Sequence, residues 1–501
     1  MTKPNILFIL NDHQTYYGHG DAFGGLEIQR PNFERIAKGG IEFTNAYTAS
    51  PLCGPARRTI LTGLYPHNHK EILNEVCHPF DRKTYLEILA ENGYKNYYYG
   101  KWHAGPETAH ELKCEGFSYP RYGNPYITPA YKEYITKNNL PHFEVKLTHS
   151  FYNPEWKSAK EAGIQVGVSY TPSNENYDES VCGIMTTPEK THEAFFLADL
   201  ACEQLDKIAT SNDETPFNMS IHFWGPHPPY FVSQECLDLY NPQDFPEYPN
   251  FADDLRNKPE IYQYDMYYPI AENGRLIIPN PLSWDQWRRI LPYSYAHTTL
   301  IDKAGGMILD KLDELGLSEN TIVIWTLDHG DALGCHGGHF DKDCYMPEEM
   351  IKVPFAMRYP QQIDKCQKSS RFVSNIDIAP TLLDVAGLEF EDPIDGRSLL
   401  PVCIDPTIEW REDIMVETHG HKHIHLGRAI ITKRFKYVFN DKFKNELYDL
   451  SADPYELKNL IDDDKYYEIL ADLKSRLKIW RARTNDPFTK KREIRKFFLR
   501  K

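Results

Sequence analysis

Short apolar runs that alternate with helix-like segments are the feature that most constrains the fold of this chain. Five such runs, each bounded by turn residues, lie at residues 6–10, 96–99, 217–223, 321–327 and 353–357. Continuous apolar runs of this length are typical of strands that are buried on both faces of a mainly parallel sheet. Segments with helical periodicity lie between them, at residues 57–61, 85–91, 191–208, 298–315 and 378–386. The sequence therefore predicts a layered α/β fold.

Composition excludes several classes of protein. Hydrophobic residues make up 41% and charged residues 26% of the 501 residues, and no apolar run approaches the length of a membrane span, so we expect no membrane anchor. The net charge of −16 argues against nucleic-acid binding, which requires clustered Lys and Arg. The first residues lack a signal-peptide pattern, which predicts a cytoplasmic protein. The ten cysteines show no paired spacing, so neither a zinc knuckle nor a disulfide framework is indicated.

The composition and periodicity of the sequence change at three places. Residues 119–178 and 236–287 are irregular and rich in aromatic residues, and we interpret them as insertions, the first with long loops near the mouth of a site. From residue 405, strand-like segments and a final helix predict a small antiparallel sheet with a covering helix, at residues 428–432, 434–440, 446–450 and 463–483. The predicted domains are thus 1–404 and 405–501. The sequence does not indicate an oligomeric state.

The basic tail at residues 490–501 is interpreted first as the solvated end of a terminal helix. Contact with a membrane surface and docking between copies of the chain are the alternatives.

Polar side chains follow several of the predicted strands directly. Asp12 follows the first, Lys101 and His103 the second, His227 the third, and Asp328-His329 the fourth. In an open α/β sheet the ligand site lies outside the carboxyl ends of the strands, so these side chains should converge. Each aspartate alone is equally consistent with a cap or turn residue. Together they are candidate ligands for a divalent metal.

Cys53 lies in a second informative segment, in which Cys53, Pro55 and Arg57 have the spacing C-x-P-x-R and Thr62-Gly63 follow. Pro55 fits the first position of a helix, whose start offers free N–H groups to an anion. Arg57 adds a planar cation one turn later. This segment predicts an anion site at the start of a helix.

These segments together resemble the type I sulfatases, which belong to the alkaline phosphatase superfamily. The likeness is ordered along nearly the whole chain, and the motifs that carry it are residues 5–12, Cys53 to Gly63 with 64–67, Gly100-Lys101-Trp102-His103, Pro226-His227-Pro228-Pro229, Asp328-His329-Gly330 with Lys342, and 447–450 with 453–460. The resemblance implies a large, mixed, mainly parallel sheet sandwiched by helices, with a small C-terminal antiparallel sheet and a helix.

The resemblance also implies a mechanism and its residues. A maturation enzyme would oxidise Cys53 to formylglycine, and the hydrated aldehyde would supply both the attacking hydroxyl and the hydroxyl that later expels the transferred group. Asp12, Cys53, Asp328 and His329 would hold one divalent ion, with Ca²⁺ expected first and Mn²⁺ or Zn²⁺ as alternatives. The expected charge clamps are Arg57, Lys101 and Lys342, and the expected proton-transfer groups are His103 and His227.

Two positions depart from the commonest arylsulfatase pattern. His13 stands where a second aspartate is usual, and His329 where asparagine is usual. Both changes resemble the phosphonate monoester hydrolase branch. We also consider substrate contacts from His13, Gln14, His419 and His421. The alternating histidines 419, 421, 423 and 425 would share one face of a strand, where a second metal site or a plain polar surface is the alternative.

Three functions therefore stay open. The first is hydrolysis of a sulfate ester, with sulfated carbohydrates as the favoured class. The second is hydrolysis of a phosphonate monoester or phosphodiester on the same scaffold. The third is a non-catalytic relative that binds an anion or a glycan with Cys53 unmodified.

Overall fold

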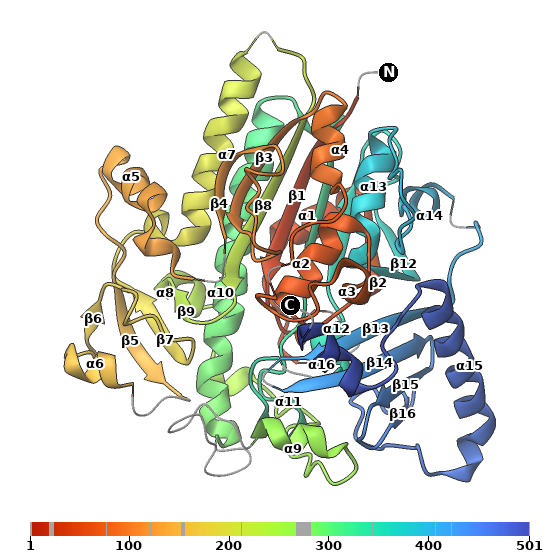
Figure 1. Ribbon diagram of the computed structural model, residues 1–501. Coiled ribbons are helices and arrows are strands. Elements are labelled where there is room, and N and C mark those ends of the chain that lie inside the picture. The colour runs from red at the N-terminus through yellow and green to blue at the C-terminus, as the bar shows by residue number, and fades with distance from the viewer. Residues whose placement is uncertain are drawn as a thin grey trace.

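The largest sheet of the computed structural model has eight strands, in the order β12-β2-β11-β10-β1-β8-β3-β4 (Figure 1). The structure describes residues 3–19, 25–76, 78–120, 123–151, 156–211, 213–266, 282–342, 345–405, 407–421 and 423–499. In sheet order the strands are Gln367–Ser374, Ile41–Tyr47, Phe355–Arg358, Thr321–Leu327, Asn5–Asp12, Phe217–Pro226, Lys95–Lys101 and Cys114–Tyr119. Strands β10, β1, β8 and β3 are parallel neighbours, whereas β11 runs antiparallel to both β10 and β2. The mixed, mainly parallel sheet is confirmed.

Strand β1 is buried on both faces because helices cover both sides of this sheet. Leu7 and Ile9 face one core together with residues of α7 and α10, and Ile6, Phe8 and Leu10 face a second core with residues of α2, α4 and α13. This division follows the two-residue period of a strand. The long apolar run that predicted β1 thus reflects two cores that meet at one strand.

The predicted helices are present with shifted boundaries, and further helices occur that were not predicted. Their bounds are Pro31–Gly39 (α1), Cys53–Thr62 (α2), Pro66–His69 (α3), Tyr85–Glu91 (α4), Pro129–Lys137 (α5), Lys157–Glu161 (α6), Glu193–Thr210 (α7), Gln234–Leu237 (α8), Glu260–Met266 (α9), Trp284–Glu314 (α10), Cys335–Gly338 (α11), Glu348–Ile351 (α12), Ile378–Val385 (α13), Leu400–Ile404 (α14), Tyr467–Arg483 (α15) and Lys491–Leu499 (α16). Helix α10 begins well before the predicted residue 298, because a capping box at Ser283 and Gln286 starts it and Pro292 does not end it.

The segment predicted as long loops, residues 119–178, contains regular structure instead. It supplies α5 and two strands of a four-stranded sheet with the order β6-β5-β7-β9, whose strands are Ser169–Tyr170, Val145–Ser150, Val181–Met185 and Tyr230–Val232. Aromatic packing stabilises this unit. For example, the stacked rings of Tyr126 and Phe143 have centroids 4.0 Å apart. Of the second irregular stretch, residues 267–281 lie outside the described residues.

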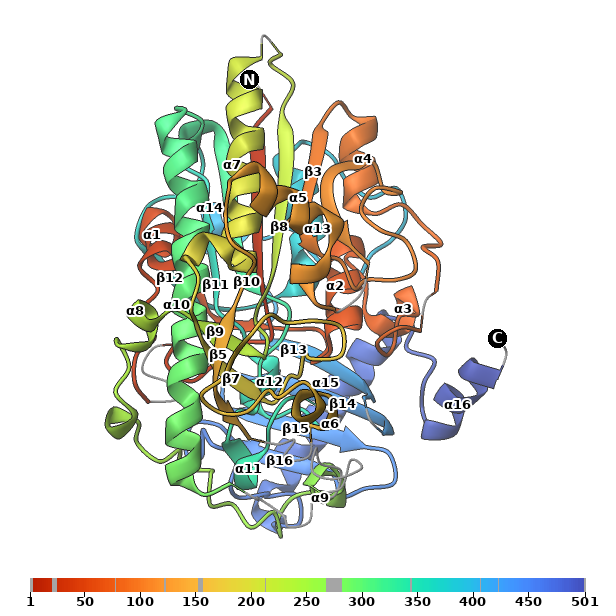
Figure 2. The same cartoon turned by 90° about the vertical axis from the view of Figure 1, so that its left-hand side faces the viewer.

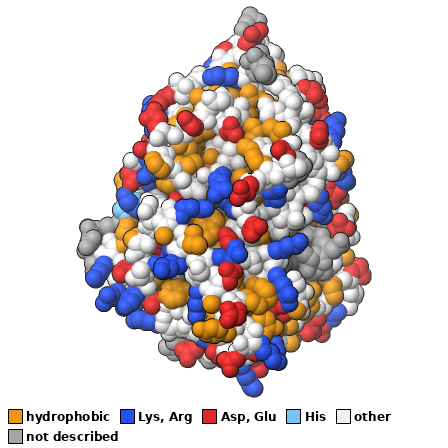
Figure 3. Space-filling model, turned by 90° about the vertical axis from the view of Figure 1, so that its right-hand side faces the viewer, with side chains coloured by type: hydrophobic (Ala, Val, Ile, Leu, Met, Phe, Trp, Pro, Cys, Tyr) orange, Lys and Arg blue, Asp and Glu red, His pale blue; other side chains and the backbone are white. Residues whose placement is uncertain are grey.

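The C-terminal antiparallel sheet is confirmed and has the order β13-β14-β15-β16. Its strands are Asp413–Gly420, Ile424–Thr432, Phe435–Asn440 and Glu446–Asp449, and α15 covers it at the lower right of Figure 1. Figure 3 shows positive and negative side chains interspersed over the side of the molecule that carries this sheet. Within the described ranges, no helix is both long enough and apolar enough to cross a membrane.

Candidate active site

The carboxyl ends of four adjacent parallel strands bring the predicted side chains together. Asp12 ends β1, Lys101 ends β3, Asp328 follows β10, and His227 follows β8. Because these strands are neighbours, residues up to 316 positions apart in sequence converge on one edge of the sheet. The predicted convergence is therefore observed.

Cys53 enters this edge as the first residue of α2, and its side chain lies among the metal-ligand candidates. Its Sγ atom is 3.0 Å from Nε2 of His329 and 3.7 Å from Oδ1 of Asp12. Leu52 is the N-cap, so the helix starts two residues earlier than the predicted start at Pro55. Every residue of α2 is buried, and Cys53 is only 1% exposed.

Two cations balance the two buried carboxylates. Nε of Arg57 donates to Asp328 at 2.9 Å, and Nζ of Lys101 contacts Asp12. Burial alone would raise the pKa of Asp12, but Lys101 and Arg57 hold it well below its usual value. Both carboxylates and both cations are shielded from solvent. The site therefore carries a preformed, charge-paired centre.

His329 is oriented by the backbone so that one ring nitrogen faces the cluster. Its Nδ1 lies 2.8 Å from the carbonyl oxygen of Gly330, which is the geometry of an Nδ1–H donor. Such a donor leaves the Nε2 lone pair free, and Nε2 is the atom that faces Cys53. Asp12, Cys53, Asp328 and His329 place one ligand atom each within 4.8 Å of one another. This group could hold a metal ion.

A second polar group borders the first and contains Lys342. Nζ of Lys342 lies 2.8 Å from Oδ1 of Asp341 and 3.3 Å from Nε2 of His227. The His227 ring packs against that of His13, with centroids 4.6 Å apart. Nε2 of His13 lies 3.4 Å from Asp341 and 3.5 Å from Asp331. His13 thus joins the wall of the site, with two carboxylates near its Nε2 atom.

Burial keeps the two predicted proton-transfer histidines neutral. The pKa of His103 is lowered well below its usual value by burial and by Lys101, and that of His227 by burial and by Lys342. Burial would also lower the pKa of Lys342, but Asp341 raises it well above its usual value. Lys342 is therefore a charged side chain beside the neutral ring of His227.

The Cys53 thiol is not a ready nucleophile in this environment. Burial raises its pKa to about 12, even though Lys101 and Lys342 act in the opposite direction. Cysteine attacks as the thiolate, so an unmodified Cys53 would be inert near neutral pH.

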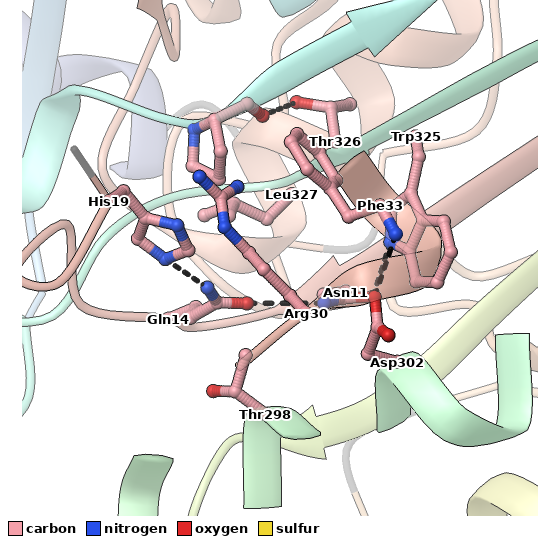
Figure 4. Close-up of a pocket in the computed structure, with 11 residues that line it drawn as sticks. Asn11, Gln14, His19, Arg30, Phe33, Thr298, Asp302, Trp325, Thr326 and Leu327 are labelled. Atoms are coloured by element: carbon pink, nitrogen blue, oxygen red, sulfur yellow. Dashed lines mark hydrogen bonds between the residues drawn. The ribbon is translucent and has the colours of Figure 1, made fainter. Parts of the chain in front are cut away.

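Three predicted substrate residues lie in different surroundings. Oε1 of Gln14 accepts from Nδ2 of Asn11 at 3.1 Å, and its Nε2 contacts His19, beside a cavity of about 10 Å³ (Figure 4). His419 is buried, and its Nε2 lies 3.2 Å from Oε1 of Glu417. His421 lies at the rim, with Nδ1 3.4 Å from the carbonyl oxygen of Lys342.

The alternating histidines do not share one strand. Strand β13 ends at Gly420 and β14 begins at Ile424, so a hairpin turn separates His419 from His425. Gly420 allows this turn because its φ of 101° lies in the region that favours glycine. The prediction of one continuous strand was wrong.

Sequence reasoning missed several side chains of the site. Asp331 and Asp341 lie 3.5 and 3.4 Å from Nε2 of His13, Nδ1 of His222 lies 3.3 Å from Nη1 of Arg57, and Asn74 accepts from the backbone N–H of Gly54 at 2.9 Å. Glu179 is close enough to the second group for burial and Asp341 to raise its pKa to about 7. Asp331 and Asp341 stand two residues after His329 and directly before Lys342, which is the signal that could have found them.

Comparison with known proteins gives matches over nearly the whole chain. The family model "Sulfatase" matches residues 4–388, and the model "N-sulphoglucosamine sulphohydrolase, C-terminal" matches residues 334–483. The chain is 27% identical to an ulvan-active sulfatase of Formosa agariphila, covering 100% of this chain and 84% of that protein. It is also 27% identical to an N-acetylglucosamine-6-O-sulfatase of Bacteroides thetaiotaomicron, with 93% and 84% covered.

Solved structures share the fold. One is the structure of a protein in complex with that protein's substrate, D-glucosamine-2-N,6-O-disulfate. Its TM-score is 0.70 and its identity 23%, covering 97% of this chain and 99% of that one. Another is the phosphonate monoester hydrolase of Agrobacterium radiobacter, at a TM-score of 0.75 and 22% identity, covering 96% of each chain.

Proposed function

Because this chain belongs to the sulfatase family and is a sulfuric ester hydrolase, we propose that it hydrolyses sulfate esters of carbohydrates through a formylglycine made from Cys53. The observation that carries the proposal is the position of Cys53. Its Sγ atom lies among Asp12, Asp328 and His329, where an unmodified thiol has a pKa of about 12. A site built around a thiolate would lower that pKa rather than raise it.

The modified residue supplies the chemistry that a thiol lacks. One hydroxyl of the hydrated aldehyde would attack sulfur as the ester oxygen leaves, and the second would lose its proton as the aldehyde re-forms and sulfate departs. Arg57 is fixed by Asp328 and orients the carboxylate wall. Lys101 and Lys342 both lie near enough to Cys53 to act on its charge, and they would stabilise the charge of the transferred group.

Proton transfer to the leaving oxygen is assigned to the second polar group. Lys342 is charged and lies 3.3 Å from the neutral ring of His227. A proton could pass from Lys342 through or beside His227 to the departing alcohol oxygen, which needs one proton to leave as an alcohol. The proton released by the second hydroxyl as the aldehyde re-forms would return to Lys342, whose charged form Asp341 stabilises.

The donor set fits a divalent cation. Two carboxylates and an imidazole with a fixed Nε2 lone pair surround residue 53. When bound, the ion would polarise the sulfate oxygens and lower the pKa of a hydroxyl beside it. The carboxylates favour Ca²⁺, which we propose first, and the imidazole makes Mn²⁺ and Zn²⁺ the alternatives. Elemental analysis of protein purified without added metal tests this order.

The carbohydrate part of the proposal rests on the relatives. The protein of Bacteroides thetaiotaomicron is named for N-acetylglucosamine 6-O-sulfate, and that of Formosa agariphila for ulvan. Both match this chain over at least 93% of its length. We therefore propose a sulfated sugar rather than a simple aryl ester as the substrate class.

A phosphonate monoester or phosphodiester is the second candidate substrate. The presence of an imidazole at His329, whose Nε2 lies 3.0 Å from Cys53, favours it, because this position distinguishes the chain from the commonest arylsulfatase pattern. Matched aryl sulfate, phosphonate monoester and phosphodiester substrates would separate the candidates. A higher kcat/KM for either phosphorus ester would overturn the sulfatase assignment of this site.

The formylglycine proposal is tested on the protein itself. After co-expression with a maturation enzyme, the intact mass of the peptide that spans residue 53 should show the aldehyde. Cys53→Ala should remove turnover while circular dichroism and Tm stay close to those of the native protein. An unmodified cysteine in active enzyme, or full activity in Cys53→Ala, would contradict the proposal.

A further inference from the structure

Helix α16, with Lys490 directly before it, forms a compact basic surface on an acidic protein. Lys490, Arg492, Arg495 and Lys496 are exposed within seven consecutive residues, whereas the whole chain has a net charge of −16. We call these four residues the basic rim. Arg492 and Lys496 are one helical turn apart, so like charges face each other on the exposed side of α16.

Among the described residues, the four cations of the basic rim lack a carboxylate partner, whereas several other surface cations have one. Elsewhere Lys38 pairs with Glu34, Lys83 with Glu91, and Lys137 with Glu203, at 2.9, 2.6 and 2.7 Å. In the described ranges, none of the four rim cations has a side-chain carboxylate oxygen within 4.0 Å of its charged nitrogen. An external polyanion would therefore relieve like-charge repulsion without breaking an existing pair.

The apolar side of α16 is already used by the protein. Ile494 is fully buried in a small cluster with Ile72, Leu426 and Phe488. The ring of Phe497 lies 5.0 Å from that of His78. A helix that inserts into a membrane surface needs its apolar side free. This packing argues for a polar partner in solution rather than a membrane.

Two segments connect the basic rim to the active site. Ile72, Leu73 and Val76 pack in the cluster of α16, and the nearby Asn74 accepts from the N–H of Gly54, next to Cys53. The second segment is the β13–β14 hairpin. Its Ile424 packs in the α16 cluster, and its His421 lies 3.4 Å from the carbonyl oxygen of Lys342. Figure 2 shows α16 on the same side of the molecule as α2 and α3.

We propose that the basic rim binds additional sulfate groups of a multiply sulfated oligosaccharide, while one sulfate ester of the same chain occupies the site at Cys53. This inference rests on the proposed function, because it assumes a sulfated saccharide as substrate. Arg and Lys suit sulfate oxygens because they donate several charged hydrogen bonds. The rim thereby selects polymeric over monomeric substrates.

The test neutralises three rim cations in one variant, Arg492→Gln/Arg495→Gln/Lys496→Gln. The matched control is Lys465→Gln/Lys474→Gln/Lys478→Gln, which removes three exposed cations from α15 and the turn before it. KM is measured for a heparin-derived octasaccharide and for a monosulfated glucosamine. We expect the rim variant to raise KM for the octasaccharide at least fivefold with unchanged kcat, and to leave both constants for the monosaccharide unchanged.

Direct binding separates this inference from the proposed function. Calorimetry with Cys53→Ala and the octasaccharide needs no turnover, and we expect the rim substitutions to weaken binding and its salt dependence. If the native enzyme cleaves no sulfate ester, the proposed function fails while this binding is still measured. Equal octasaccharide binding by the rim and control variants would overturn the inference. So would a rim-dependent change of oligomeric mass, or rim-dependent binding to anionic lipid vesicles that exceeds octasaccharide binding.

Discussion

At the scale of single residues, the site depends on a lysine held charged beside neutral histidines. Lys342 keeps its proton because Asp341 is 2.8 Å away, whereas burial keeps His227 neutral. The expectation that a histidine carries the proton followed from its usual pKa near 6.5. Burial of His227 lowers its pKa, because desolvation disfavours the imidazolium ion. The role of a histidine in proton transfer stays a prediction.

Replacing Lys342 by alanine should reduce kcat/KM for a sulfate ester by a factor of about 10²–10³, the range found when one preorganised donor is removed. The loss should be smaller for an ester with a good leaving group, such as 4-nitrophenyl sulfate, because its oxygen needs less protonation. Steady-state kinetics on esters with alcohol leaving groups of graded pKa checks this. An equal loss on every ester would assign Lys342 to binding of the sulfate group alone.

The residues that sequence could predict are those that follow strands. Asp12, Lys101 and Asp328 each come directly after or at the end of a buried apolar run, and the structure brings them together. Asp341 and Glu179 follow no such run and lie on connecting segments. Only the position of Asp341 directly before Lys342 could have marked it, and Glu179 had no local signal. The substrate contact of Gln14 stays a prediction, and in the structure its side chain accepts a hydrogen bond from Asn11.

At the scale of elements, a buried ion pair ties the short helix α3 to the C-terminal sheet. Nδ1 of His67 lies 2.6 Å from Glu417 of β13, and its Nε2 lies 3.0 Å from the carbonyl oxygen of Thr484. Both ring nitrogens therefore face acceptors, which requires the imidazolium form. Burial would lower the pKa of His67, but Glu417 raises it above its usual value.

The raised pKa gives this pair a defined pH dependence. The imidazolium contributes its full stabilisation below the unfolded pKa of about 6.5, and loses it as pH rises through the higher folded value. For Glu417, burial would raise the pKa, but Arg428 and His67 hold it well below its usual value. Its contribution is thus present above about pH 4.3 and lost at lower pH as pH falls through the folded value.

We expect His67→Gln to lower the free energy of unfolding by about 3–5 kcal/mol near pH 6, the usual cost of breaking a buried pair. The difference in Tm from the native protein should narrow between pH 6 and pH 9. Thermal denaturation at a series of pH values measures it. His142→Gln, at an exposed histidine, is the matched control. A difference in Tm that grows with pH would refute the assignment.

Elements with mixed polar content were the ones that sequence patterns missed. Strand β13 is buried over most of its length, yet it carries Glu417 and His419 inside, so no apolar run marks it. Strand β12 begins with an alternating polar stretch and becomes buried only at Phe372. Charges that are paired in the fold cannot be told from surface charges in a single sequence.

At the scale of the whole molecule, a buried polar junction joins the eight-stranded sheet to the C-terminal sheet. Nζ of Lys436 in the C-terminal sheet lies 3.3 Å from Glu348 of α12 and 2.7 Å from Glu456. The hydroxyl of Tyr47 at the end of β2 donates to Glu348 at 2.9 Å. Separation of the sheets would leave these charges buried without partners or exposed on a new surface.

The enzyme should therefore unfold in one cooperative transition despite its predicted division at residue 404. Residues 1–404 expressed alone should not reach a stable fold, because Glu348 would lose Lys436 and the cover of the C-terminal sheet. Differential scanning calorimetry of the full chain and circular dichroism of the truncated chain check both statements. Two resolved transitions, or a stable fragment, would show that the sheets fold independently.

The burial of α2 also sets the order of events in biosynthesis. Every residue from Cys53 to Thr62 is enclosed once the chain has folded, so a second enzyme could reach the thiol only beforehand. A maturation enzyme should convert a synthetic peptide of residues 50–63 but leave folded, unmodified protein unchanged, as mass spectrometry would reveal. Conversion of the folded protein would contradict this. Modification would then be possible only before folding. Each copy of the chain would become permanently active or permanently inert when α2 packs into the fold.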